Sequence, residues 1–116
     1  MATELTAKRC VPCEGGIPTL DSHQIDELLS QVPMWKVTTD GKSLERRLKL
    51  DDFMAAITLF QAVAVVAEAE NHHPDLHLTS YNRVRIGLST HAVGGLTEND
   101  FILAAKIDQI PLPGLA

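Results

Sequence analysis

The chain has 116 residues, of which 45% are hydrophobic, and its formal net charge is −5 at pH 7. This length leaves room for one domain but not for a second core, and the composition excludes a disordered chain. The acidic balance argues against direct nucleic-acid binding, because proteins that bind phosphate backbones gather Lys and Arg on one face.

The sequence carries no clear targeting or membrane signal. It has no apolar run long enough to cross a bilayer without a polar interruption, and no basic region followed by an apolar core at the N-terminus. Two short basic strips, within residues 46–49 and 83–85, are interpreted as the solvated side of strands. We therefore expect a cytoplasmic protein that contacts neither membrane nor nucleic acid.

Residues 1–18 contain Gly15-Gly16 and two prolines without periodicity, which predicts an irregular arm. Cys10 and Cys13 have CxxC spacing, which can indicate a zinc or redox site. One CxxC supplies two ligands where a structural zinc site needs four, and the strand-then-helix setting of a thioredoxin-like motif is missing. We interpret the pair as thiols without a function and expect no disulfide framework.

The first helix is predicted to begin near residue 21. Asp21 or Ser22 can cap it, Gln24 is placed to complete a capping box, and Pro33 closes it. The residues of its apolar stripe recur at helical spacing: Ile25, Leu28, Leu29 and Val32.

Two strands are predicted next, over residues 34–38 and 43–50, with the turn signal Asp40-Gly41-Lys42 between them. Period-two alternation places the leucines of the second strand on one face: Leu44, Leu48 and Leu50. Trp35 is expected in the core.

The longest helix is predicted to start at Asp51-Asp52 and to end near Pro74, since the residue before a proline is pushed out of the α region. Its expected stripe comprises Phe53, Ile57, Phe60, Ala64 and Ala67. Further valines widen the apolar surface beyond what a lone amphipathic helix needs: Val63, Val65 and Val66. This width predicts burial on more than one side, under the sheet or against a partner subunit.

A second hairpin is predicted from strands 76–80 and 84–89, with Tyr81-Asn82 as the turn. One face carries the apolar residues Leu76, Leu78, Val84, Ile86 and Leu88, and the other carries His77, Thr79 and Tyr81. After Gly94-Gly95, Thr97 is expected to cap a last helix with Asp100 in capping-box position. Its apolar stripe comprises Leu103, Ile107 and Ile110.

This order predicts an α+β domain over residues 19–110, in which a four-stranded antiparallel sheet has three helices packed on one face in the order α-β-β-α-β-β-α. Residues 111–116 form a tail. The open edges of so small a sheet favour pairing between subunits, so we expect a homodimer or a dimer of dimers.

Four of the five histidines lie within residues 68–91. His72 and His73 lie at a helix end, and the predicted hairpin can return His91 beside them. Imidazoles exchange protons near pH 7, so this grouping indicates acid–base catalysis. Glu68, four residues before His72, is placed to orient it. His23 and His77 are expected on exposed faces without a role.

A metal site is the main alternative for the histidines. His73, His77 and His91 could supply three imidazoles to one ion. No HExxH or nearby cysteine accompanies them, however, and adjacent side chains at a helix end diverge. We therefore expect no metal.

The pattern Glu68-x-x-x-His72-His73-Pro74, followed by Tyr81, Ser89-Thr90-His91 and Asp100, resembles the signature of the pterin-4a-carbinolamine dehydratase family. The strings Tyr81-Asn82-x-Val84 and Gly95-Leu96-Thr97-Glu98-x-Asp100 extend the resemblance, and Trp35 and Phe53 fall where the family has aromatics. The resemblance covers about residues 20–110.

The resemblance implies the same fold and the dehydration of a 4a-hydroxytetrahydropterin to the quinonoid dihydropterin, which recycles the cofactor of aromatic amino acid hydroxylases. It implies no metal or resident cofactor. His73 and His91 would form the main acid–base pair, and His72 would position the substrate, supported by Glu68. The residues implied to line the pterin pocket are Glu68, Asn71, His72, His73, Ser89, Thr90, His91, Ala92 and Asp100.

The sequence departs from the family pattern at two positions. Ala92 stands where many members have an acid, and Asn71 stands where some animal members have Asp. Asp100 also has an ordinary explanation as a capping residue. The alternative function is a non-catalytic oligomerisation or assembly partner, as in proteins of this family that act with transcription factors. The intact histidine trio favours the enzyme.

Overall fold

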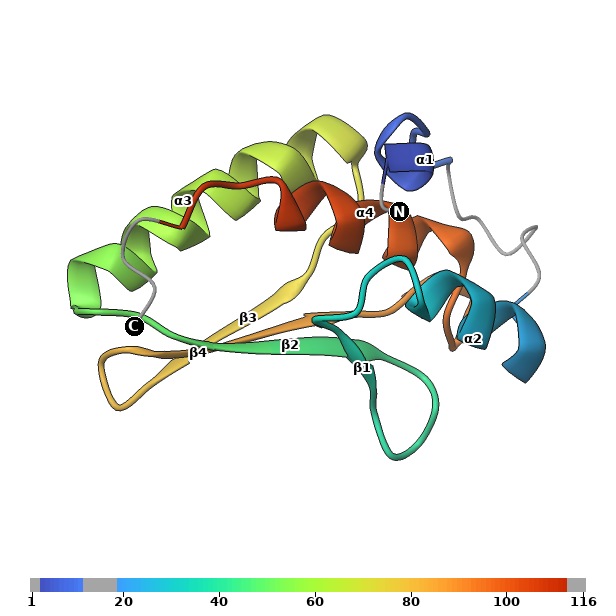
Figure 1. Cartoon of the computed structure of the whole chain (residues 1–116), viewed down its shortest axis with the longest axis horizontal. Coiled ribbons are helices and arrows are strands. Elements are labelled where there is room, and N and C mark those ends of the chain that lie inside the picture. The colour runs from blue at the N-terminus through green and yellow to red at the C-terminus, as the bar shows by residue number, and fades with distance from the viewer. Residues whose placement is uncertain (1–2, 12–18, 113–116) are drawn as a thin grey trace.

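A computed structural model describes residues 3–11 and 19–112. In chain order its elements are α1 (Thr3–Thr6), α2 (Ser22–Leu29), β1 (Lys36–Val37), β2 (Leu44–Lys49), α3 (Phe53–Glu70), β3 (Asp75–Thr79), β4 (Arg83–Leu88), the 3-10 helix η1 (His91–Val93) and α4 (Glu98–Asp108). The strands form one four-stranded antiparallel sheet in the order β1-β2-β4-β3. Helices α3 and α4 lie over one face of this sheet, and α2 lies at its β1 end (Figure 1). The predicted fold class and element order are confirmed, with α1 and η1 as additions.

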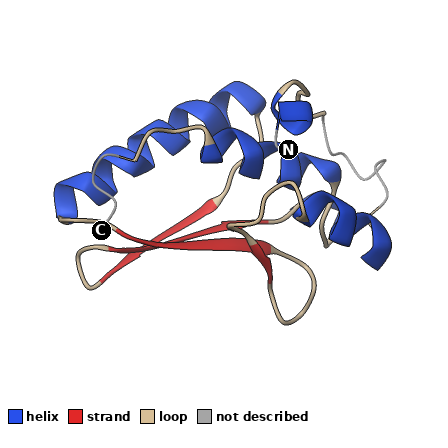
Figure 2. Cartoon of the chain, viewed as in Figure 1, coloured by secondary structure: helices blue, strands red, loops and turns tan. Residues whose placement is uncertain are grey.

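The strands form one layer beneath the helices (Figure 2), and their register separates an apolar inner face from a polar outer face. Arg46 and Leu76 both pair with Ile86, and Leu48 and Leu78 both pair with Val84. The leucine, valine and isoleucine side chains among these residues point toward the helices, as the alternation of the sequence predicts. The outer face is consequently left to the alternate residues, most of which are charged.

The β3–β4 turn lies one residue earlier than predicted. The residues with positive φ are Ser80 (49°) and Tyr81 (59°) rather than Asn82. Asn82 is instead buried, and its side-chain amide donates a hydrogen bond of 2.9 Å to the carbonyl of Leu50. Its side chain therefore ties the hairpin to the end of β2, a long-range contact that local turn rules do not reveal.

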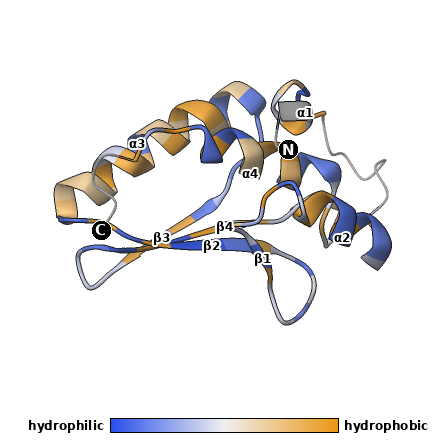
Figure 3. Cartoon of the chain, in the orientation of Figure 1, coloured by the Kyte–Doolittle hydropathy of each residue, from blue (hydrophilic) through white to orange (hydrophobic). Residues whose placement is uncertain are grey.

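The buried stripe of α3 differs from the predicted one. The buried residues are Ala56, Leu59, Val63 and Ala67. The displaced stripe leaves Phe53, Met54 and Val65 exposed by 51, 67 and 72% of their surface, and Figure 3 shows the hydrophobic character of this helix along much of its length.

Helix α3 also has the length and composition of a membrane-crossing helix, with a mean hydropathy of 1.6 over its 18 residues, contrary to our expectation that the chain has no such segment. A core helix of a globular protein meets the same criterion, so this property alone is weak support for a membrane span. The helix ends at Glu70 because Asn71 adopts the left-handed conformation (φ 52°), three residues before Pro74.

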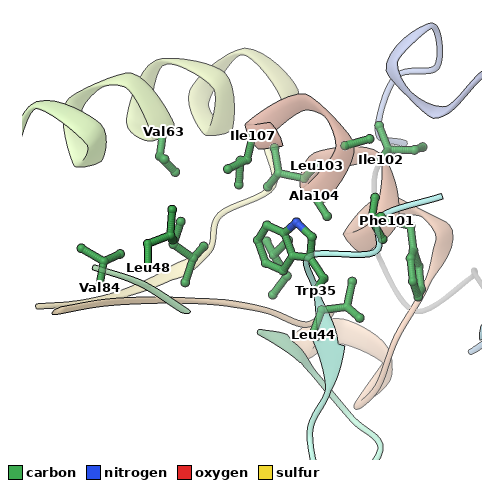
Figure 4. Close-up of a cluster of buried hydrophobic side chains, with 14 of the residues drawn as sticks. Trp35, Leu44, Leu48, Val63, Val84, Phe101, Ile102, Leu103, Ala104 and Ile107 are labelled. Atoms are coloured by element: carbon green, nitrogen blue, oxygen red, sulfur yellow. The ribbon is translucent and has the colours of Figure 1, made fainter. Parts of the chain in front are cut away.

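The core lies between the sheet and the helices, with Trp35 near its centre (Figure 4). Trp35 is buried, as predicted, although strand β1 begins only at Lys36. Its indole nitrogen donates a hydrogen bond of 2.9 Å to Asp108, and the same carboxylate oxygen accepts a bond of 2.6 Å from Arg46. The Arg46–Asp108 ion pair thus brings two charges to the edge of the hydrophobic core.

The N-terminal segment was expected to be irregular, but its described residues pack on the domain. Leu5 in α1 is 1% exposed. The Cys10 amide donates to Glu70, and Val11 exchanges two hydrogen bonds with the Asn99 side chain. Burial, together with the nearby Glu70 carboxylate, raises the pKa of the Cys10 thiol to about 12, which disfavours the thiolate that redox or zinc chemistry requires. Cys13 lies outside the described residues.

Removing the Asp108 carboxylate should destabilise the fold strongly. The Arg46 side chain is 8% exposed, so Asp108→Ala leaves a buried cation without its partner. Such losses cost about 3–5 kcal/mol of unfolding free energy, which urea denaturation measures. The matched control is Glu45→Ala, which removes the carboxylate bound to the largely exposed Arg47 and should cost about 0–1 kcal/mol. Equal losses in the two variants would contradict this assignment.

Candidate functional site

The carboxylate of Asp100 is the centre of a buried hydrogen-bond network. Its side chain is fully buried. One oxygen accepts bonds from the Thr97 amide at 3.0 Å and from the Thr90 hydroxyl at 2.9 Å. The other oxygen lies 2.7 Å from Nε2 of His72. The expected capping box is therefore present, and the same carboxylate also contacts a histidine.

This network joins three elements that are distant in sequence. His72 follows α3, Thr90 follows β4, and Asp100 lies in the first turn of α4. An isolated bridge between Thr90 and Gly95 closes the loop that contains η1. Asp100 thus links the end of α3 to the end of β4, while the convergence of His91 with His72 and His73 stays a prediction.

The contact with Asp100 fixes the orientation of the His72 ring. Nε2 of His72 lies 2.7 Å from the carboxylate, and the side chain is only 10% exposed. Because Thr90 and Thr97 hold the same carboxylate, the imidazole is bound to a fixed group and has little freedom to rotate.

Glu68 pairs with His73 and not, as predicted, with His72. Nε2 of His73 lies 2.5 Å from a carboxylate oxygen of Glu68. The prediction used the i,i+4 rule, which holds only while the helix continues. Because Asn71 leaves the helical conformation, His72 turns inward to Asp100 and His73 takes the place beside Glu68. Both members of this pair are exposed, by 55 and 76% of their side chains.

The other predicted pocket residues have mixed positions. His91 begins η1 and is exposed, as are Asn71 and Ala92, whereas Ser89 is half-buried and Thr90 is buried. Among the described side chains, no hydrogen bond joins His91 to either of the other two site histidines. Thr90 was predicted to line the pocket, but its side chain is buried and donates a hydrogen bond to Asp100.

His23 is exposed on α2, and His77 lies on the outer face of the sheet opposite Arg85, as predicted. Within residues 3–11 and 19–112, no three His, Cys, Asp or Glu side chains are grouped so as to hold a metal ion. The alternative trio of His73, His77 and His91 therefore has no geometric support.

Sequence reasoning missed the pairing of Asp100 with His72 and with the Thr90 hydroxyl. The Thr-x-x-Asp pattern indicated only a helix cap. The sequence does contain a related signal, because Thr90 stands directly before His91 and seven residues before the capping box of α4. This spacing indicates a contact between Thr90 and Asp100 only once β4 and α4 are known to be neighbours.

Comparison with known proteins identifies the family. The sequence profile described as pterin 4 alpha carbinolamine dehydratase matches residues 18–110. The chain belongs to this family. It is 46% identical to a Halorhodospira halophila protein named provisionally as a pterin-4-alpha-carbinolamine dehydratase, over 91% of this chain and 96% of the relative. It is 43% identical to pterin-4-alpha-carbinolamine dehydratase 2, mitochondrial, of Arabidopsis thaliana, over 97% of this chain and 62% of the relative.

Solved structures of similar fold agree with this assignment. A Brucella melitensis protein described as a transcriptional coactivator/pterin dehydratase superposes with a TM-score of 0.72 at 31% identity, covering 78% of this chain and 96% of that one. A pterin dehydratase-like protein described as a RuBisCO assembly factor of the alpha-carboxysome superposes with a TM-score of 0.53 at 21% identity, covering 64% and 84%. The second likeness shows the fold alone.

Replacing Asp100 by Ala should break this hydrogen-bond network and lower the free energy of unfolding. The Thr97 amide loses its acceptor and His72 loses its partner, and an unsatisfied buried group costs about 1–3 kcal/mol. We expect a loss of at least about 2 kcal/mol in urea denaturation, with a change in the His72 ring nitrogen shifts by NMR.

The matched control is Asp52→Ala, which removes the N-cap of α3 and should cost about 0.5–2 kcal/mol. It should leave the His72 resonances unchanged. Identical His72 spectra in wild type and Asp100→Ala would show that this contact does not exist in solution.

Proposed function

We propose that this protein dehydrates a 4a-hydroxytetrahydropterin to the quinonoid dihydropterin by histidine general acid–base catalysis. The observation that carries the proposal is the buried Asp100–His72 pair, which joins the end of α3 to the end of β4. This pair holds one imidazole in a fixed orientation, and His73 and His91 are exposed, which supports a reaction with two proton transfers.

The chemistry needs one acid and one base. The acid protonates the 4a-hydroxyl, the C4a–O bond breaks, and water leaves. The base takes the N5 proton, and the N–H electron pair forms the N5=C4a double bond. Protons and charge balance without a redox partner, and we propose that the reaction proceeds without a metal.

We assign the acid–base pair to His73 and His91. Both are exposed and can exchange protons with substrate and solvent. Glu68 supports His73 through its hydrogen bond, and His72, held in place by Asp100, orients the pterin. Asn71, Ser89 and Ala92 flank these histidines in the chain and complete the proposed pocket.

The proposed physiological setting follows from the product. A dihydropterin released by this reaction can be reduced again to the tetrahydropterin that an aromatic amino acid hydroxylase uses. We therefore propose that the protein acts in tetrahydrobiopterin recycling in the cytoplasm.

Alanine substitutions of the proposed pair test the mechanism. General acid–base groups contribute about 10²–10⁴-fold, so His73→Ala and His91→Ala should each lower kcat/KM by about 100-fold or more. The measurement is the absorbance decay of freshly generated 4a-hydroxytetrahydropterin. His77→Ala is the matched control, because His77 is exposed on the outer face of the sheet. A wild-type rate equal to the buffer rate would refute the enzyme.

A second candidate function is that of an oligomerisation or assembly partner. The exposed apolar residues of α3 favour it, since Phe53, Met54 and Val65 leave a hydrophobic helix face without cover in the single chain. The description of the Brucella relative joins coactivator and dehydratase roles in one protein. Self-association through α3 is compatible with either function, and we propose a homodimer or a dimer of dimers.

Charges on α3 should disrupt this association. Met54→Glu and Val65→Glu place carboxylates on the exposed apolar face of the helix, where an interface would desolvate them. Light scattering should show an oligomer for the wild type and smaller particles for these variants. Met34→Glu is the control, because Met34 is 61% exposed but lies outside α3. A monomeric wild type would refute the predicted assembly.

A further inference from the structure

A cluster of positive charge lies on the outer face of the sheet. A cleft of about 390 Å³ is lined there by Arg47, Leu48, Lys49, His77, Thr79, Arg83, Val84 and Arg85. These residues come from β2, β3 and β4. We call this surface the basic cleft. It holds four of the chain's ten Lys and Arg residues, although the net charge is −5.

The register of the sheet sets these cations side by side. Arg47 pairs with Arg85, which pairs on its other side with His77. One step toward the β3–β4 turn, Lys49 pairs with Arg83, which pairs with Thr79. Directly opposed like charges destabilise an antiparallel sheet. The fold alone therefore gives no reason for this arrangement.

Few carboxylates compensate the cluster. Arg47 bonds to Glu45 at 3.2 Å. Within the part of the chain that the structure describes, Lys49, Arg83 and Arg85 have no ion-pair partner. The two flanking carboxylates, Glu45 and Asp75, both lie one row away, where each is opposite Gly87. Glu45 and Asp75 thus border the positive surface along one side, and the two rows of cations face outward from the sheet.

The dimensions indicate the size of the ligand. Two rows on three strands span roughly 10 Å by 7 Å, from the strand spacing and the rise per residue. This footprint is far smaller than the roughly 600–1,000 Å² that even a single DNA-binding module buries. The cleft volume lies instead within the range of small-molecule sites.

We propose that the basic cleft binds a small molecule bearing a di- or triphosphate group. Adjacent guanidinium groups match the geometry of phosphate oxygens, and the lysine and the Thr79 hydroxyl add further donors. Bound phosphates would also relieve the repulsion between the paired cations. The proposal is independent of the pterin reaction, because the cleft lies on the outer face and toward the turn end of the β3–β4 hairpin, whereas His72 and Thr90 lie at the other end.

Calorimetric titration of the full chain with inorganic triphosphate, in magnesium-free buffer, tests the proposal. We expect one triphosphate per chain, binding more tightly than orthophosphate and weakening as salt rises. Arg83→Gln/Arg85→Gln should weaken binding by about tenfold or more. Lys36→Gln/Lys42→Gln removes the same charge from exposed positions outside the cleft and should change affinity by less than about twofold.

Thermal unfolding without ligand gives a second readout. Because the double arginine variant removes repulsion, it should melt no lower than wild type, which also shows that it folds. Absence of triphosphate binding by wild type, equal loss in both double variants, or equal affinity for orthophosphate would overturn the proposal. Much tighter binding of a single-stranded 20-nucleotide DNA would also overturn it, in favour of a nucleic-acid surface.

Discussion

The Asp100 carboxylate has no contact with solvent and is satisfied entirely by groups from other parts of the chain: the Thr97 amide, the Thr90 hydroxyl and His72. A buried carboxylate is tolerated only with such partners, since desolvation without hydrogen bonds is unfavourable. Its bonds therefore constrain where α4 begins, where β4 ends and how the chain leaves α3. The placement of the candidate site depends on this one group.

Helix α3 carries apolar residues both on the side that the domain buries and on sides that it leaves exposed. Toward the interior of the domain it presents Ala56, Leu59, Val63 and Ala67, all of which are buried. Its other sides still carry Met54 and Val65, which the domain does not cover. When apolar residues lie all around a helix, their periodicity does not identify which side is buried. This explains why the sequence predicted the length of α3 but not its buried side.

The features that the sequence predicted well depend on local rules. The alternation in β3 and β4, the Asp21 and Thr97 capping boxes and the burial of Trp35 follow from neighbours in the chain. The features that it missed depend on contacts between distant segments. Asn71 in the left-handed conformation redirects two histidines at once, and the docking of residues 3–11 requires Glu70 and Asn99, sixty or more residues away.

The position of His72 bears on the choice between enzyme and scaffold. The Thr97–Asp100 box would cap α4 whether or not a histidine reached it, because the box uses one carboxylate oxygen and leaves the other free. A scaffold of this fold could fill the same space with an apolar side chain and avoid burying a polar ring. The sequence instead buries an imidazole to 10% exposure against that oxygen and follows it with an exposed second imidazole paired to Glu68. Folding does not require this combination, and it therefore favours the proposed enzyme over a scaffold.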